Sequence, residues 1–173
     1  PGINQQRAQD GGALAGGPGG RVLSRAALVD PFSRWTLETF PFHIQKCVDK
    51  RLIDELAELD FIDRGQSVVF IGQPAVGKSG LASGIMMKAL YAGRRCRAIT
   101  ADALFEELGN SHADRSTRRR LQRLARLDLL LIEEFGFINP LEPAQVNAFF
   151  RLMDDRCNRK STIISTNLGY DEW

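Results

Sequence analysis

Hydrophobic residues along this chain occur in two patterns that alternate with each other. Short continuous apolar runs at 67–71, 128–133 and 162–166 predict strands buried on both faces. A further short strand is predicted at 96–100. Apolar positions three or four residues apart predict helices, and they lie at 44–60, 78–92, 101–108, 114–126 and 143–159. The alternation predicts an α/β fold in which helices cover both faces of a parallel sheet.

In the last predicted helix, 143–159, the spacing of the apolar residues indicates which face of the helix is apolar. A proline suits its first turn, and five apolar residues recur at intervals that place them on one face of the helix. These residues are Val146, Phe149, Phe150, Met153 and Cys157.

The first 43 residues differ in composition from the rest of the chain. Residues 1–20 contain seven glycines and almost no large apolar side chains. Such a stretch cannot bury enough surface to offset the entropy lost on ordering, so we expect a disordered tail. Residues 21–43 carry several aromatic side chains and are expected to pack as a lead-in on the domain surface. The folded domain is predicted to occupy 44–173.

Composition narrows the class of protein. The 173 residues are 25% charged and 43% hydrophobic, which suits one soluble domain, and the net charge of +2 does not by itself call for nucleic acid. Cys47, Cys96 and Cys157 have no metal-binding spacing, so we expect reduced buried thiols in a cytoplasmic protein. No run of roughly 18 apolar residues could span a membrane, and no secretory leader is recognisable.

The clearest motif lies between the first predicted strand and the next helix, and it fits GxxxxGK[ST]. The residues expected to bind a ligand here are Gly72, Gln73, Pro74, Ala75, Val76, Gly77, Lys78, Ser79 and Gly80. The glycines let backbone N–H groups turn toward phosphate oxygens, and the helix adds the positive end of its dipole. Lys78 can then reach the β- and γ-phosphates, and Ser79 can coordinate Mg²⁺. A glycine-rich turn that merely contains these residues is the alternative.

Two acids follow the buried run at 129–132. In the usual arrangement of such sites the first acid supports Mg²⁺ and the second polarises the attacking water. Glu133 is therefore the candidate metal residue and Glu134 the candidate catalytic residue. Glu133 stands where Asp is usual, and its extra methylene moves the carboxylate about 1.5 Å farther out, one single-bond step. Two acids that only end a strand are the alternative.

Asn167 ends the last predicted strand. The carboxyl ends of parallel strands face the ligand crevice, so its side chain can reach the γ-phosphate or the water that attacks it. Taken alone, Thr166 and Asn167 would indicate turn chemistry; taken with the two preceding motifs, they indicate a phosphate sensor. The chain has no Asn-Lys-x-Asp element for guanine, so adenine is the expected base and ATP the expected nucleotide.

Arginines cluster in the helix predicted at 114–126. At 100° per residue, four of them fall within about 80° of one another, opposite Leu121 and Leu124. These four are Arg115, Arg119, Arg123 and Arg126. Such a stripe can neutralise phosphates of duplex DNA. A solvated face, or pairing with acids of another subunit such as Glu106 and Glu107, is equally open.

The motifs together resemble the IstB family of transposition helper ATPases, which are relatives of DnaC-type helicase loaders in the AAA+ class of P-loop NTPases. Besides the P-loop, the resemblance is carried by segments at 36–40, 59–65, 127–136 and 161–173. It implies an ATP- and Mg²⁺-binding protein that binds DNA, forms a homo-oligomer and assists a transposase. A replicative helicase is the partner under the loader alternative.

The resemblance also implies a role for each site residue. Lys78 and Ser79 would bind the nucleotide and Mg²⁺, Glu133 and Glu134 would occupy the Walker B positions, and Asn167 would be sensor one.

Two departures from the family pattern modify these expectations. Glu133 replaces the usual Asp, and the family continues past the position of Trp173 with a helix and a strand that usually bring an arginine to a neighbour's ATP site. The chain therefore resembles a partial copy whose last strand is missing. ATP binding is expected to survive better than hydrolysis or ring assembly. A module that holds ATP or DNA without turnover is the alternative.

Overall fold

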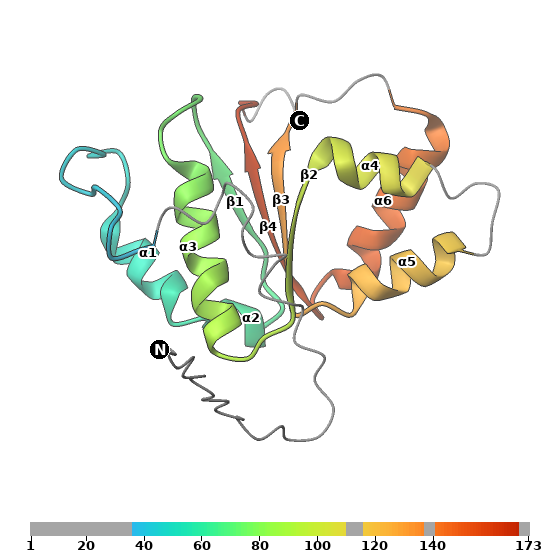
Figure 1. The fold of residues 1–173 in the computed structure, drawn as a ribbon, viewed down its shortest axis with the longest axis horizontal. Coiled ribbons are helices and arrows are strands. Elements are labelled where there is room, and N and C mark those ends of the chain that lie inside the picture. The colour runs from blue at the N-terminus through green and yellow to red at the C-terminus, as the bar shows by residue number, and fades with distance from the viewer. Residues whose placement is uncertain (1–35, 110–115, 137–140, 170–173) are drawn as a thin grey trace, which may run out of the picture.

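The computed structural model describes residues 36–109, 116–136 and 141–169. Its centre is a four-stranded sheet in the order β1-β4-β3-β2, and every neighbouring pair of strands is parallel (Figure 1). The strands are β1 (Val68–Ile71), β2 (Cys96–Thr100), β3 (Leu129–Phe135) and β4 (Ser161–Thr166). The predicted α/β fold with a parallel sheet is confirmed.

Helices cover both faces of the sheet, also as predicted (Figure 1). One face carries α1 (Lys50–Ala57), α2 (Asp60–Asp63) and α3 (Lys78–Tyr91). The other carries α4 (Ala101–Gly109), α5 (Ser116–Ala125) and α6 (Pro143–Arg156). Within the described ranges, no helix is long and apolar enough to cross a membrane.

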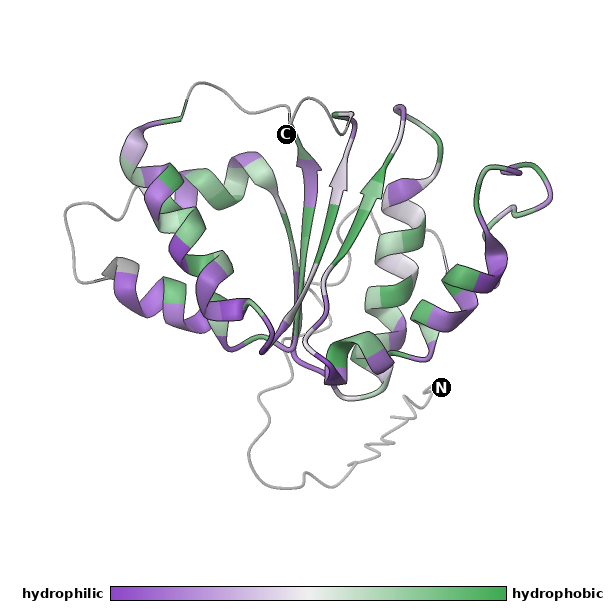
Figure 2. Cartoon of the chain, turned by 180° about the vertical axis from the view of Figure 1, so that it is seen from behind, coloured by the Kyte–Doolittle hydropathy of each residue, from purple (hydrophilic) through white to green (hydrophobic). Residues whose placement is uncertain are grey.

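Strand β3 joins the two halves of the core, because alternate residues of a strand face opposite sides of a sheet. Leu129 and Leu131 belong to the cluster formed with α3. Leu130 and Ile132 belong to the cluster formed with α4, α5 and α6. Figure 2 shows hydrophobic colouring along the first part of this strand, between the two helical layers, and hydrophilic colouring toward its end. The unbroken apolar run in the sequence thus reflects burial on both faces.

The first strand departs from the prediction. The run at 67–71 was expected to be buried on both faces, but Val69 and Ile71 are 44% and 43% exposed. The reason is position: β1 pairs only with β4 and forms an edge of the described sheet. Composition alone does not distinguish an edge strand from a central one.

The first helix is shorter than predicted. It was expected over 44–60, but α1 begins at Lys50, because the carboxylate of Asp49 accepts a hydrogen bond from the Arg51 N–H at 2.9 Å and caps the helix there. Backbone turns occupy the residues before it. Leu59 then adopts a positive φ of 70° and separates α1 from α2.

The last helix also differs from its predicted face. Leu152 and Arg156 are its buried residues, and they lie two positions from Phe150 and one position from Cys157. Phe150 is 62% exposed and Cys157 is exposed, so these two residues do not belong to the buried face of the helix. The helix ends at Arg156 because Cys157 leaves the helical conformation, with φ −52° and ψ 127°.

The cysteines are free, but only one is buried. Cys96 packs in the core, where burial raises the pKa of its thiol to about 12. Cys47 and Cys157 are exposed, which corrects the expectation of buried thiols at those two positions. In the described part of the chain, no three His, Cys, Asp or Glu side chains form a metal cluster.

The buried charge of Arg156 holds together the helical layer formed by α4, α5 and α6. Arg156 is fully enclosed and donates to the carbonyls of Leu124 and Leu127 at 2.6 and 3.0 Å, and to Thr162 Oγ1 at 3.0 Å. Its guanidinium also bonds the Ser161 carbonyl. Arg156 thereby ties the end of α5 to α6 and β4. Burial lowers the pKa of its guanidinium to about 10.

Candidate functional site

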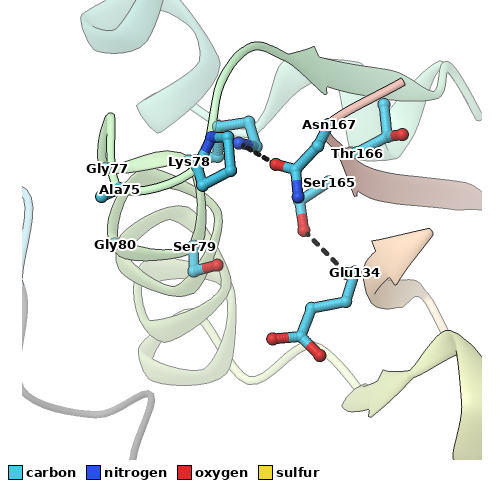
Figure 3. A pocket seen from close by; sticks show the side chains of 10 residues that line it. Ala75, Gly77, Lys78, Ser79, Gly80, Glu134, Ser165, Thr166 and Asn167 are labelled. Carbon is cyan, nitrogen blue, oxygen red and sulfur yellow. Dashed lines mark hydrogen bonds between the residues drawn. The ribbon is translucent and has the colours of Figure 1, made fainter. Parts of the chain in front are cut away.

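A cavity of about 360 Å³ opens where β1, β3 and β4 end (Figure 3). Its walls come from the phosphate-loop motif, from the end of β3 and from the end of β4. The lining residues are Pro74, Ala75, Gly77, Lys78, Ser79, Gly80, Glu134, Ser165, Thr166 and Asn167. Its volume lies in the range of small-molecule sites.

The loop before α3 has the backbone that the motif predicts. Gly77 has φ 95° and Ala75 has φ 64°, so the chain turns sharply before Lys78 begins the helix. A Cβ on Gly77 would lie 2.7 Å from the ring of Phe40, so no larger residue fits without displacing it. No side chain caps the helix here, and its first three residues line the cavity, so its first N–H groups are available as donors for an anion.

Phe40 supports this loop from behind. Its ring is 7% exposed and packs in a cluster with Ile53 and Leu81. The Phe42 ring meets it at an angle, with 4.8 Å between ring centroids. The sequence predicted that these aromatics pack on the domain, but it held no signal that one of them lies against the glycine of the phosphate loop.

Lys78 is held inside the cavity by three oxygens. Its Nζ donates to the carbonyls of Gly72 and Gln73, each at 2.7 Å, and to Oδ1 of Asn167 at 2.6 Å (Figure 3). All three acceptors are neutral, and partial burial lowers the pKa of Lys78. Among the described residues the ammonium group bonds only these neutral acceptors, and it can exchange their oxygens for phosphate oxygens.

Glu134 enters the cavity from β3. Its φ of 58° lies in the left-handed region, and its N–H donates to Ser165 Oγ on β4 at 3.3 Å. Figure 3 shows its carboxylate on the side of the cavity where Ser79 lies. A hydroxyl and a carboxylate are the hard oxygen donors that Mg²⁺ prefers, so Ser79 and Glu134 fit a magnesium ion bound together with nucleotide phosphates.

Glu133 is not brought to the cavity. Its side chain is 1% exposed, and it is absent from the residues that line the walls. The structure thus brings Lys78, Ser79, Glu134 and Asn167 to one cavity, while Glu133, the predicted metal residue, is buried next to Glu134 and does not line the walls. Of the predicted loop residues, Gly72, Gln73 and Val76 do not line the walls either, although two of them provide carbonyls to the lysine.

Two lining residues, Ser165 and Thr166, were not among the site residues predicted from the sequence. Ser165 accepts from the Glu134 N–H, and Thr166 donates its hydroxyl to the Phe135 carbonyl at 2.5 Å. Both stand directly before Asn167 at the end of a predicted buried strand. That position was the available signal, because polar side chains at a strand's carboxyl end are the ones that meet the crevice.

The arginine-rich helix exposes much of its charge. Arg119, Arg123 and Arg126 are exposed, while Leu124 is buried beneath them. Arg115 lies outside the described residues. Of the acids considered as partners in another subunit, Glu107 pairs within this chain with Arg97 on β2.

A second hollow, of about 370 Å³, lies beside that pair. It is lined by Arg97, Glu107, Arg120 and Arg123. Three guanidinium groups surround one carboxylate, so the hollow carries a net positive charge.

Sequence comparison places the chain among known proteins. The pattern of IstB-like ATP-binding proteins matches residues 21–173. The chain belongs to this family. It is 34% identical over 138 residues to the IS21 insertion-sequence ATP-binding protein of Pseudomonas aeruginosa, covering 80% of this chain and 52% of that protein. The IS5376 ATP-binding protein of Geobacillus stearothermophilus is 33% identical over 140 residues, covering 81% and 55%. The IstB-like chain thus spans about half the length of these relatives.

Solved structures share the fold of the IstB-like chain. The DnaC helicase loader superposes with a TM-score of 0.68 at 22% identity, covering 80% of this chain and 79% of that one. AMPPCP-bound DnaA from Aquifex aeolicus gives a TM-score of 0.64 at 20% identity, covering 81% and 43%. These similarities support the α/β fold with a helix-covered parallel sheet that the alternation of strands and helices predicted.

Proposed function

We propose that this IstB-like chain binds Mg²⁺–ATP in the cavity at the ends of β1, β3 and β4, and hydrolyses it to ADP and phosphate. This proposal rests on one observation: three separate parts of the chain bring polar side chains to a single cavity. These side chains are Lys78, Ser79, Glu134 and Asn167. Membership in a family of ATP-binding proteins supports adenine as the base.

Each side chain has a task that its position supports. Lys78 leaves its carbonyl partners and pairs with the β- and γ-phosphates, while the N–H groups at the start of α3 bind phosphate oxygens. Glu134 orients the attacking water and accepts its proton. Asn167 donates its amide N–H to the γ-phosphate or to that water. When bound, Mg²⁺ neutralises charge on the phosphates.

The proposed cellular task is to assist a transposase on duplex DNA in the cytoplasm, as part of a homo-oligomer. The relatives named as insertion-sequence ATP-binding proteins support a transposase as the partner. Exposed arginines at 119, 123 and 126 support DNA as the surface ligand. Loading of a replicative helicase is the alternative, since the DnaC loader shares the fold.

The first experiment measures ATP hydrolysis by the chain with Mg²⁺, with and without duplex DNA, and uses Lys78→Ala as background. Turnover above that background supports the assignment, and stimulation by DNA supports the coupling of the cavity to the arginine surface. Nucleotide binding without turnover would instead support the non-hydrolysing alternative. No binding of ATP by the wild-type chain would refute the proposal.

DNA binding is tested through its dependence on salt. Each phosphate neutralised contributes about 0.9 to the slope of log affinity against log salt. Arg119→Ala with Arg123→Ala should therefore flatten the slope by about 2. The matched control replaces Arg51 and Arg64, two exposed arginines on the opposite side of the sheet. An equal loss in both double variants would contradict a site on α5.

A further inference from the structure

The regular pairing of β3 with β4 is interrupted near the carboxyl ends of the two strands. Ile132 pairs with Ile164 and Phe135 pairs with Thr166, so two residues of β3 lie opposite the single residue Ser165. An extra residue in one strand of a pair is a β-bulge, which bends the strand and changes the direction in which a side chain points. The bulge lies at the end of the sheet where the cavity opens.

Glu134 belongs to this bulge and reaches the cavity from it. Its φ of 58° lies in the left-handed region, which residues that carry a Cβ rarely adopt. The residue is exposed and lines the cavity, with its carboxylate on the side where Ser79 lies (Figure 3). Because this backbone conformation is unfavourable for the residue itself, contacts from neighbouring groups have to hold it in place.

Two hydroxyl groups of β4 provide such contacts, one at Glu134 and one at the residue after it. Ser165 Oγ accepts a hydrogen bond from the Glu134 N–H at 3.3 Å, and Thr166 Oγ1 donates to the Phe135 carbonyl at 2.5 Å. Both hydroxyl residues are buried, yet both line the cavity. The Ser165 hydroxyl thus bonds the backbone of the residue whose carboxylate is proposed to accept the proton of the attacking water.

A second serine of the same strand offers a direct contrast. Ser161 begins β4 and is 0% exposed, against 2% for Ser165. Its hydroxyl donates to the Phe61 carbonyl at 3.0 Å, and Phe61 belongs to the core cluster packed around α3. The two serines therefore share strand, burial and one hydrogen bond from side chain to backbone. Ser165 lines the cavity, whereas Ser161 does not.

We infer that Ser165 is a positioning residue for the proposed hydrolysis: its hydroxyl fixes the backbone of Glu134 so that the carboxylate can orient the attacking water and accept its proton. This assignment rests on the proposed function. Displacement of a catalytic group by about 1 Å can slow a reaction about 100-fold. Loss of the hydroxyl should therefore slow turnover without weakening the binding of ATP, because Lys78 and the phosphate loop keep their places.

The test compares ATP hydrolysis by Ser165→Ala and by the matched control Ser161→Ala, with Lys78→Ala as background. Ser165→Ala should lower kcat by about 10- to 100-fold. Its affinity for AMPPCP, a non-hydrolysable ATP analogue, should stay within about threefold of wild type in calorimetry, which also shows that the variant is folded. Ser161→Ala should keep kcat within about threefold of wild type, although it loses a buried hydrogen bond of the same kind.

A conservative variant separates the hydroxyl from the mere presence of a side chain. Ser165→Thr keeps a hydroxyl on the same carbon, and a β-branched residue suits a strand. It should therefore retain a higher kcat than Ser165→Ala. Equal losses of kcat in these two variants, with AMPPCP affinity intact in both, would contradict a role for the hydroxyl.

The remaining outcomes separate this assignment from the proposed function. Unchanged turnover in Ser165→Ala, or equal losses in Ser165→Ala and Ser161→Ala, would overturn the positioning role and leave ATP hydrolysis in place. A loss of AMPPCP affinity as large as the loss of kcat would overturn it too, because Ser165 would then act on nucleotide binding. A wild-type chain without turnover above the Lys78→Ala background would refute the proposed hydrolysis, and this assignment with it.

Discussion

Phe40→Ala tests whether the segment before α1 supports the phosphate loop. The ring is 7% exposed, packs with Ile53 and Leu81, and lies where a Cβ on Gly77 would be 2.7 Å from it. Removing the ring leaves a cavity directly behind the loop. The substitution therefore affects both the stability of the domain and the conformation of the loop.

The expected loss of stability follows from the area that the ring buries. A phenylalanine side chain buries about 150–250 Å², and at about 25 cal/mol per Å² this corresponds to about 4–6 kcal/mol. Measured Phe→Ala substitutions in cores cost about 3–5 kcal/mol. We expect a value in this second range. If 1–2 kcal/mol of this loss comes from the phosphate loop leaving its binding conformation, ATP binding should weaken by roughly five- to thirtyfold.

Urea denaturation at neutral pH measures the first quantity and ATP titration of the folded variant measures the second. Phe150→Ala is the matched control, because that ring is 62% exposed and buries less than half as much area. It should cost no more than about 1–2 kcal/mol and leave ATP affinity unchanged. Equal denaturation midpoints for the two variants would refute the packing of Phe40 behind the loop.

Three further substitutions test contacts that stabilise the fold. Hydrogen bonds from Arg95 hold the pKa of Asp128 well below its usual range. The carboxylate therefore stabilises the fold above its unfolded pKa of about 4 and loses this effect as pH falls. Asp128→Asn should cost about 1–3 kcal/mol at pH 7 in urea denaturation, and less at pH 3. Arg156→Ala should cost at least about 3 kcal/mol, because it strands buried carbonyls. Gly84→Ala should cost about 1–3 kcal/mol, because its Cβ would lie 2.8 Å from Leu37.

Each of these has an outcome that would contradict it. A cost for Asp128→Asn that is the same at pH 3 and pH 7 would exclude an ionic origin. A neutral Arg156→Ala would mean that water replaces the guanidinium at the end of α5. Gly84→Ala with wild-type stability in thermal unfolding would show that the segment around Leu37 does not lie against α3.

The sequence predicted the fold well because its strongest signals are periodic. The runs at 128–133 and 162–166 are buried from both sides, and the structure places them as β3 and β4 with bounds shifted by one or two residues. The run at 67–71 looked the same, yet β1 lies at the edge of the described sheet. Strand order is a long-range property, and local composition does not encode it.

The candidate site was predicted in its residues more than in its geometry. Lys78, Ser79 and Asn167 meet in one cavity because each stands at a motif position that parallel topology brings to the same edge. Which of Glu133 and Glu134 lines the cavity could not be predicted in this way. A bulge of one residue decides which acid faces the cavity, and it depends on pairing with Ser165, thirty-one residues away.

Three oxygen atoms already bond the ammonium group of Lys78, so a nucleotide must replace existing hydrogen bonds when it binds. Every donor of the ammonium group already has a partner before phosphate arrives, so the ligand does not relieve a bare charge. The binding free energy that Lys78 contributes is therefore the difference between charge-assisted hydrogen bonds to an anion and hydrogen bonds to neutral carbonyl and amide oxygens. The same three oxygens receive the lysine again when the product departs, and the loop has a defined resting shape to return to between successive ligands.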